Sequence, residues 1–144
     1  MTTIADKLQQ VQHRVAQACE RAGRDPASVL LLAVSKTFGP DAVLEAARAG
    51  QHAFGENYLQ EAVEKMAALR QMGAPTLQWH CIGPVQSNKT RLVAEHFDWM
   101  HTVDRLKVAQ RLSDQRPAHL PPLQVCIQIN VDGGANKSGV APQE

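Results

Sequence analysis

A lysine stands at the end of the most apolar run in the sequence. Residues 29–34 read VLLLAV, and Ser35 and Lys36 follow directly. Such a run is typical of a β-strand that is covered on both faces, as in parallel α/β sheets. A lysine at the carboxyl end of this strand is expected to be partly desolvated, which disfavours the ammonium form and exposes a nucleophilic amine. Lys36 is therefore a candidate for a Schiff base with a carbonyl compound, and the alternative is an ordinary lysine that reaches solvent.

Polar residues also follow the other predicted strands. They are Asn57 after the second strand, Gly83 after the third, Asp104 after the fourth, and Asn130 with Lys137 after the fifth. In a parallel sheet the carboxyl ends of the strands share one rim, so these residues and Lys36 should surround one ligand pocket. Asn57 also stands at a helix start, where it either caps the helix or lies beside a bound anion.

Two further pairs of residues suggest acid–base chemistry. Ser35 is adjacent to Lys36, but neighbouring strand residues point to opposite faces of a sheet and cannot easily share a proton. Glu61 and Glu64 lie on a predicted helix, where a solvated polar face is the simpler interpretation. Neither pair is therefore predicted to be catalytic.

The elements that would position these residues alternate between helices and strands. Apolar residues at helical spacing predict a first helix over 4–22, ended by Gly23. Later helices are expected over 42–49, 58–72, 86–96 and 104–115, with Asp104 as a cap, and strands over 29–34, 52–54, 77–82, 98–103 and 123–131. Strands that alternate with helices of this length indicate βαβ units and a parallel sheet.

The length of 144 residues must be compared with the sizes of the two α/β architectures that this pattern allows. A complete TIM-type barrel has eight strands and takes about 250 residues. We therefore expect one domain over residues 1–144 that is an incomplete parallel (β/α) barrel of about five strands, with an extra N-terminal helix. The alternative is a complete, open, doubly wound sheet of five strands. The extra first helix and the lack of a helix after the fifth strand disfavour it.

Composition limits the functions that remain. The net charge is +1 without a basic block, so no nucleic-acid partner is expected. No run approaches the roughly 20 apolar residues of a membrane helix, and no signal peptide is recognisable, which favours a cytoplasmic protein without a membrane partner. The three cysteines are scattered and read as reduced thiols, and the six histidines lack metal-ligand spacing, so no metal site is predicted. Gly-rich nucleotide-binding motifs are absent from the sequence.

Four short motifs occur in order along the chain. They are AVSKT at 33–37, FGENYLQE at 54–61, WHCIGPVQSNK at 79–89 and KSG at 137–139. In sequence and spacing they closely resemble the pyridoxal phosphate homeostasis protein family, over essentially the whole chain. The segment FGP at 38–40, Cys81 and the loop DGGAN at 132–136 depart from the family pattern.

The resemblance implies a barrel of the alanine racemase type that binds pyridoxal 5′-phosphate (PLP) as an internal aldimine on Lys36. By the same match Asn57 and His80 would lie close to the cofactor, and Gly83 and Lys137 complete the predicted cofactor-binding set. Lys137 is expected near Lys36, where a second amine would help keep Lys36 deprotonated and could pass the aldehyde on. The serine- and glycine-rich loop and the arginine-containing stretch with which the family holds the phosphate have no match in this sequence.

The resemblance further implies a cytoplasmic, mostly monomeric protein that buffers PLP and delivers it to PLP-dependent apo-enzymes, without catalytic activity. The alternative is a lysine-dependent enzyme, either a PLP-dependent racemase or decarboxylase or a Schiff-base aldolase. Such an enzyme needs a placed acid and base for each face of its substrate. The sequence has one tyrosine, Tyr58, which is expected to pack, and no second domain. We therefore predict a cofactor carrier with no catalytic residue.

Overall fold

Five parallel strands form one sheet in the computed structural model, which describes residues 2–144. The strands are β1 (Ala33–Val34), β2 (Ala53–Glu56), β3 (Gln78–Cys81), β4 (Trp99–Val103) and β5 (Gln124–Ile127). Their order in the sheet is the order of the sequence, so every strand pairs with its predecessor.

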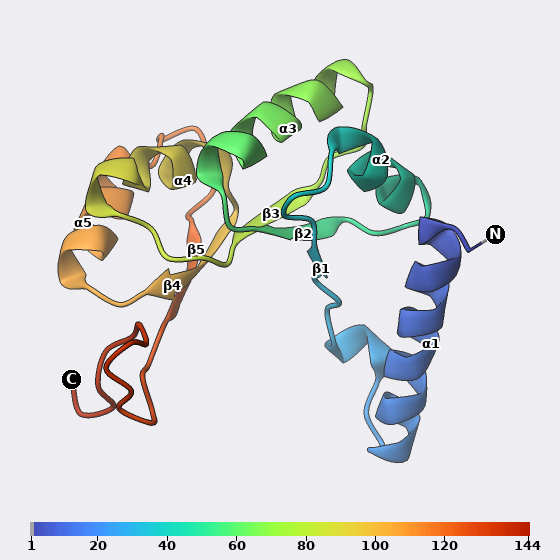
Figure 1. Ribbon diagram of the computed structural model, residues 1–144, viewed down its shortest axis with the longest axis horizontal. Coiled ribbons are helices and arrows are strands. Elements are labelled where there is room, and N and C mark those ends of the chain that lie inside the picture. Colours follow the sequence, from blue (N-terminus) through green and yellow to red (C-terminus); the bar gives the residue numbers. More distant parts are fainter. Residues whose placement is uncertain (1) are drawn as a thin grey trace.

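Helices alternate with these strands. They are α1 (Ile4–Arg21), α2 (Pro40–Arg48), α3 (Leu59–Gln71), α4 (Thr90–His96) and α5 (Leu106–Gln115), with 3₁₀ turns η1 (Pro26–Ser28) and η2 (Ser87–Lys89). Figure 1 shows α2 to α5 over one side of the sheet, and α1 packs against α2. Strands in sequential order with helices on one side are the arrangement of a (β/α) barrel, whereas a doubly wound sheet carries helices on both faces. The predicted incomplete barrel with an extra N-terminal helix is confirmed.

The core lies between the sheet and this helical layer. Every second strand residue points to the helices, which selects Phe54, Trp79, Cys81 and Met100. The rings of Phe54 and Trp79 lie 5.6 Å apart. The helices supply aliphatic and aromatic partners, namely Val43, Leu44, Met66, Leu69, Val93, Phe97, Val108 and Leu112. Burial of this surface holds the helices on the sheet.

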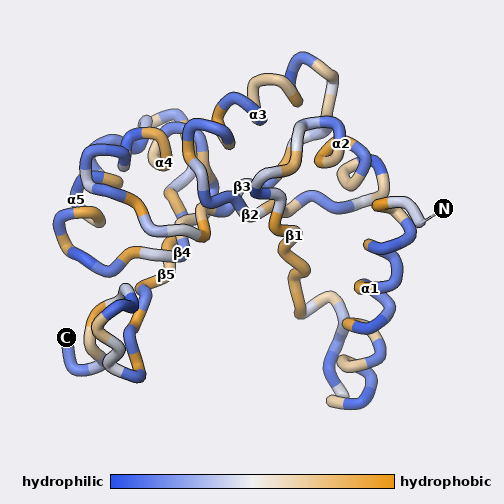
Figure 2. Tube along the Cα trace, viewed as in Figure 1, coloured by the Kyte–Doolittle hydropathy of each residue, from blue (hydrophilic) through white to orange (hydrophobic). Residues whose placement is uncertain are grey.

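The two edge strands differ from the sequence prediction. The apolar run 29–34, a continuous hydrophobic stretch in Figure 2, pairs only at Ala33–Val34, and Leu30 is 64% exposed. The expected burial on both faces is wrong, because the helices cover one face of the sheet and the other face is open. At the other edge, all four residues of β5 are exposed, and the strand is shorter than the expected 123–131.

Two helix starts also differ. The helix expected over 86–96 begins at Thr90, because residues 87–89 form the tighter turn η2. The predicted cap Asp104 does not cap α5; its carboxylate accepts a hydrogen bond from the backbone N–H of Gly139 at 3.1 Å instead. Asp104 therefore ties the end of β4 to the C-terminal loop.

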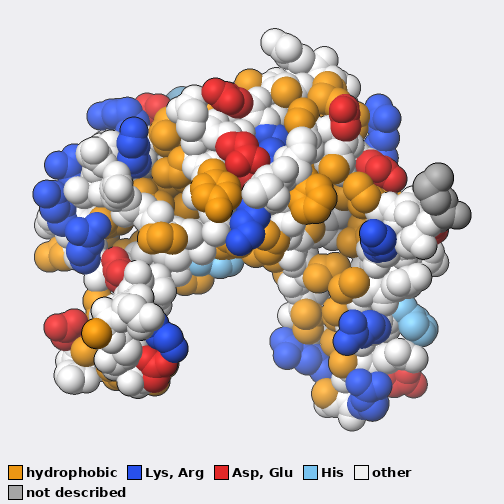
Figure 3. Space-filling model, in the orientation of Figure 1, with side chains coloured by type: hydrophobic (Ala, Val, Ile, Leu, Met, Phe, Trp, Pro, Cys, Tyr) orange, Lys and Arg blue, Asp and Glu red, His pale blue; other side chains and the backbone are white. Residues whose placement is uncertain are grey.

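The face of the sheet opposite the helices is open. In the space-filling view, α1 on one side and the C-terminal loop on the other flank a hollow beneath the strands (Figure 3). This inner face corresponds to the interior of a barrel. Within residues 2–144, none of the helices combines the length and apolar character needed to span a bilayer.

Candidate functional site

Lys36 lies in a tight turn directly after β1. The N–H of Phe38 donates to the carbonyl oxygen of Ser35 at 3.2 Å, which closes a β-turn with Lys36 and Thr37 at its centre. Ser35 is buried, whereas Lys36 is exposed. The expectation that Lys36 is partly desolvated is therefore wrong in this chain, because Lys36 lies in an exposed turn beyond the end of β1.

Ser35, the buried residue before Lys36, has its own partners. The hydroxyl of Ser35 donates to the carboxylate of Glu56 on the side of the sheet that faces α3. Lys36 follows in the turn itself, beyond the last strand residue Val34, and its side chain is exposed. As predicted, Ser35 and Lys36 do not form an acid–base pair.

The residue after Lys36 has an unusual backbone conformation. Thr37 has a φ of 68°, and no other non-glycine residue within 2–144 has a positive φ. A β-branched residue in this region carries a strain of about 1–3 kcal/mol, which the surrounding structure must offset. The third position of a type II turn requires this φ and usually holds glycine or asparagine. Nothing in the sequence signals the strain at Thr37.

The two carboxylates of α3 behave differently from each other. Glu61 is half-buried, and its Oε1 accepts a hydrogen bond from the backbone N–H of Thr37 at 3.1 Å. Glu64 is exposed and bonds only to Gln60 of its own helix, at 3.3 Å. The expected solvated face is therefore correct for Glu64 and wrong for Glu61. The contact depends on how α3 packs beside the turn, which helical periodicity does not reveal.

Asn57 and Gly83 lie in contact at the carboxyl ends of β2 and β3. A Cβ atom on Gly83 would be 3.2 Å from Cγ and 3.3 Å from both Cα and Cβ of Asn57, so the two loops pack closely. The Thr102 hydroxyl donates to the carbonyl of Gly83 at 2.7 Å and fixes the loop to β4. The side-chain oxygen Oδ1 of Asn57 is buried without a hydrogen-bond partner. An unpaired acceptor beside a glycine is compatible with a ligand that donates a hydrogen bond to it.

His80 lies on the inner face in a chain of hydrogen bonds. Its Nε2 is 2.9 Å from Oε1 of Gln78, and its Nδ1 is 2.8 Å from Nε2 of His101. The ring stacks on Trp99 with centroids 5.5 Å apart. Burial, followed by the nearby His101, lowers the pKa of His80 to about 4. His80 is thus a neutral ring whose two nitrogens have protein partners, and its contact with a cofactor stays a prediction.

Lys137 is an exposed residue of the C-terminal loop. Its ammonium group forms an ion pair with Asp132 of the same loop. This hydrogen bond, with that from the Gly134 N–H, lowers the pKa of Asp132. In Figure 1 the loop lies at the lower left and β1 near the centre, and β1 and β5, the strand that leads to the loop, are opposite edges of the sheet. The structure therefore brings Asn57 and Gly83 together, while Lys137 contacts its own loop and its role beside Lys36 stays a prediction.

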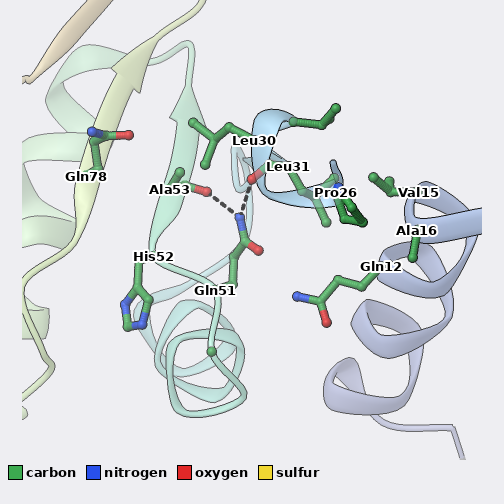
Figure 4. Close-up of a pocket in the computed structure, with 12 residues that line it drawn as sticks. Gln12, Val15, Ala16, Pro26, Leu30, Leu31, Gln51, His52, Ala53 and Gln78 are labelled. Atoms are coloured by element: carbon green, nitrogen blue, oxygen red, sulfur yellow. Dashed lines mark hydrogen bonds between the residues drawn. The ribbon is translucent and has the colours of Figure 1, made fainter. Parts of the chain in front are cut away.

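Two pockets distinguish the two ends of the sheet. A pocket of about 430 Å³ lies at the carboxyl ends of β3 to β5 and is lined by Pro84, Val85, Gln86, Thr102, Asp104, Arg105, Gln128 and Ser138. A second pocket of about 480 Å³ lies between α1 and the amino ends of the first strands (Figure 4). There Gln51 Nε2 donates to the carbonyls of Leu31 and Ala53, at 2.7 and 2.8 Å. Only the first pocket shares the rim of Asn57 and Gly83. Residues 2–144 contain no cluster of three or more potential metal ligands.

The sequence and the fold correspond to a known class of protein. The family model described as "Alanine racemase, N-terminal domain" matches residues 7–144, and the chain belongs to this family. Among curated proteins it is 60% identical to the pyridoxal phosphate homeostasis protein of Pseudomonas aeruginosa, over the whole chain and 61% of that relative. It is 56% identical to the protein of the same name from Escherichia coli K12, over 97% of the chain and 60% of that relative. The resemblance inferred from the four motifs is confirmed.

Solved structures give the same result. PipY of Synechococcus elongatus without PLP matches with a TM-score of 0.75 and 40% identity, over 90% of this chain and 59% of that chain. PipY with PLP bound matches with a TM-score of 0.73 and 38% identity, over 90% of this chain and 58% of that chain. A protein of unknown function from Bifidobacterium adolescentis matches with a TM-score of 0.82 and 32% identity, over 97% of this chain and 60% of that chain. The chain thus spans about 60% of the length of the relatives that it matches.

Proposed function

We propose that this chain carries the lysine and part of the rim of a PLP-binding protein that buffers and delivers the cofactor in the cytoplasm. The observation that carries the proposal is the position of Lys36, exposed at the centre of a turn at the carboxyl end of β1. Within residues 2–144 no carboxylate lies at ion-pair distance from its ammonium group. The PLP-bound relative PipY supports this choice of ligand.

Each rim residue has a distinct role in this proposal. PLP would supply an aldehyde, to whose carbon the Lys36 amine would bind with loss of water. Asn57 Oδ1, buried and unpaired, accepts a hydrogen bond from the ligand. Gly83 lets its loop pack closely on Asn57 and keeps Asn57 in place, because a larger residue would press on that side chain. His80 remains neutral, as its low pKa requires, and adds no positive charge to the site. Lys137 is proposed as a transient second acceptor of the aldehyde.

A carrier agrees better with these residues than a racemase, decarboxylase or aldolase. Catalysis needs an acid or base aimed at the substrate. The only tyrosine, Tyr58, is 53% exposed at the start of α3, and both nitrogens of His80 have protein partners. The curated relatives are named for PLP homeostasis. We therefore propose a non-catalytic role in which PLP-dependent apo-enzymes receive the cofactor. Turnover of D- or L-alanine, or of an aldol substrate, by the purified chain would favour the enzymatic alternative.

Reductive trapping tests the site directly. The purified chain is mixed with PLP, its absorbance is scanned for the new lysine–cofactor band, and the bond is reduced with borohydride before peptide mapping. The label should lie on Lys36 and disappear in Lys36→Arg, which keeps the positive charge but cannot form the bond. Lys89→Arg is the matched control and should keep the label. A label mainly on Lys89 or Lys137 would contradict the assignment.

A further inference from the structure

A buried group of charged residues lies behind the Lys36 turn, on the helix-covered side of the sheet. Lys65 of α3 is 4% exposed, and Glu56 at the end of β2 is completely buried. The Lys65 ammonium donates to Glu56 Oε2 at 2.8 Å and lies 3.5 Å from Glu61 Oε1. Two buried ions are costly to desolvate, so such a pair contributes little net stability and is better explained by the geometry that it fixes.

The pair fixes the peptide group that precedes Lys36. The Lys65 ammonium donates a second hydrogen bond to the backbone carbonyl of Ser35, at 2.9 Å. The hydroxyl of Ser35 donates to Glu56 Oε2 from the other side. Ser35 is therefore held by its carbonyl oxygen and by its side chain, and both partners are buried.

Glu61 fixes the peptide group that follows Lys36. Its Oε1 accepts the hydrogen bond from the N–H of Thr37 and also faces the Lys65 ammonium. Thr37 is the residue held at a φ of 68°. A strained conformation of this kind persists only where its surroundings over-determine it, and here the surroundings are Glu61 and Lys65. Both peptide groups that flank Lys36 are thus bonded to one connected set of side chains.

We propose that Glu61 and Lys65 are positioning residues that hold the strained turn and thereby aim Lys36 at its ligand. The proposal rests on the proposed function, in which Lys36 binds PLP. Neither residue needs to touch the cofactor, since both act through hydrogen bonds to the peptide groups of Ser35 and Thr37. Without them, Thr37 relaxes to a negative φ and the Lys36 side chain loses its fixed direction.

Replacement of Glu61 gives the sharpest test, because it is half-buried and its loss leaves the buried Lys65–Glu56 pair in place. Glu61→Ala should raise the dissociation constant for PLP about tenfold, the scale of one lost charge-assisted hydrogen bond. Glu61→Gln keeps an acceptor for the Thr37 N–H and should recover most of this loss. Glu64→Ala, which removes a neighbouring exposed glutamate, is the control and should stay within about twofold. Equal constants for Glu61→Ala and Glu64→Ala would overturn the proposal.

A second substitution separates positioning from a general structural role. Glycine adopts a positive φ without strain, so Thr37→Gly should form the same turn without help from Glu61. In the Thr37→Gly background, Glu61→Ala should therefore raise the dissociation constant by less than about threefold. A tenfold loss in both backgrounds would show that Glu61 acts in some other way than by holding Thr37.

Amide hydrogen exchange distinguishes failure of this inference from failure of the proposed function. If the unmodified chain binds no PLP at Lys36, the proposed function is wrong, and exchange at the Thr37 amide without cofactor then decides the positioning role. Faster exchange in Glu61→Ala but not in Glu64→Ala supports it. The same exchange rate in all three proteins overturns it.

Discussion

The protonation state of His80 follows from its two hydrogen bonds. Because Gln78 Oε1 is an acceptor, Nε2 of His80 must carry the proton, and Nδ1 must then accept from Nε2–H of His101. A proton added to His80 would put two donors face to face. Burial also lowers the pKa of His101, so both rings favour the neutral form. At neutral pH both rings are therefore uncharged and keep the hydrogen bond between them.

This arrangement predicts that stability falls in mild acid. The pKa of His80 is about 4 in the folded chain and 6.5 without the fold, so the unfolded state binds the proton first. The contribution of neutral His80 is complete above pH 6.5 and is lost as the pH falls from 6.5 to about 4, by on the order of 2 kcal/mol. Urea unfolding at pH 7 and pH 4.5 measures it. His80→Gln should show a smaller fall, and equal falls would contradict the assignment.

Gly83 is the second residue whose substitution has a defined outcome. In Gly83→Ala the new methyl group meets Asn57 at 3.2–3.3 Å, including its backbone Cα, which cannot rotate away. We expect a loss of about 1–3 kcal/mol in the free energy of unfolding and weaker PLP binding. Gly39→Ala is the control, since nothing lies within 4 Å of its Cβ position. Gly39→Ala should lower the free energy of unfolding by less than about 1 kcal/mol, because Gly39 is the N-cap residue of α2. Equal losses would refute the packing argument.

At the scale of elements, α3 is joined to β2 and to the end of β1 by the buried Lys65–Glu56 pair. Lys65→Met removes one ion and leaves Glu56 buried without its partner, so we expect a loss of about 3–5 kcal/mol in chemical unfolding. The double variant Lys65→Met/Glu56→Leu removes both ions and should recover part of this loss. A double variant no more stable than the single one would contradict the assignment of the loss to an unpaired, buried Glu56 carboxylate.

The elements show which parts of the structure were accessible from sequence. The apolar spacing of α1 and the glycines that follow α1, α2 and α3 allowed these helices to be predicted, because both signals are local in the sequence. Burial of 29–34 was predicted wrongly because it depends on which strand lies beside β1, and the inner face is open there. The position of Lys36 after the first strand was predicted, but the turn that holds it was not. The support of this turn by Glu61 was missed, since it joins residues 24 positions apart through the packing of α3.

The whole molecule has the shape of an arch with two unpaired sheet edges. Strands β1 and β5 each have one neighbour. Along the segment that begins with β5, the exposed fraction is 49% for Val125, 67% for Ile127 and 83% for Val131. An apolar groove of about 610 Å³ lies between this edge and α5. An exposed strand with unpaired N–H and C=O groups and apolar side chains is a template for pairing with another chain.

We therefore predict that this 144-residue chain, purified alone, associates through β5 or has low stability. Light scattering over a range of concentrations should show a mass that rises with concentration. Ile127→Lys places a charge on the exposed strand and should shift the chain toward the monomer, because an edge lysine opposes pairing. The control is Leu106→Lys, which changes an equally exposed apolar residue on α5 outside the strand and should leave association unchanged. A concentration-independent monomer with a cooperative thermal transition would contradict the prediction and would mean that the five-stranded arch is stable without a partner at β5.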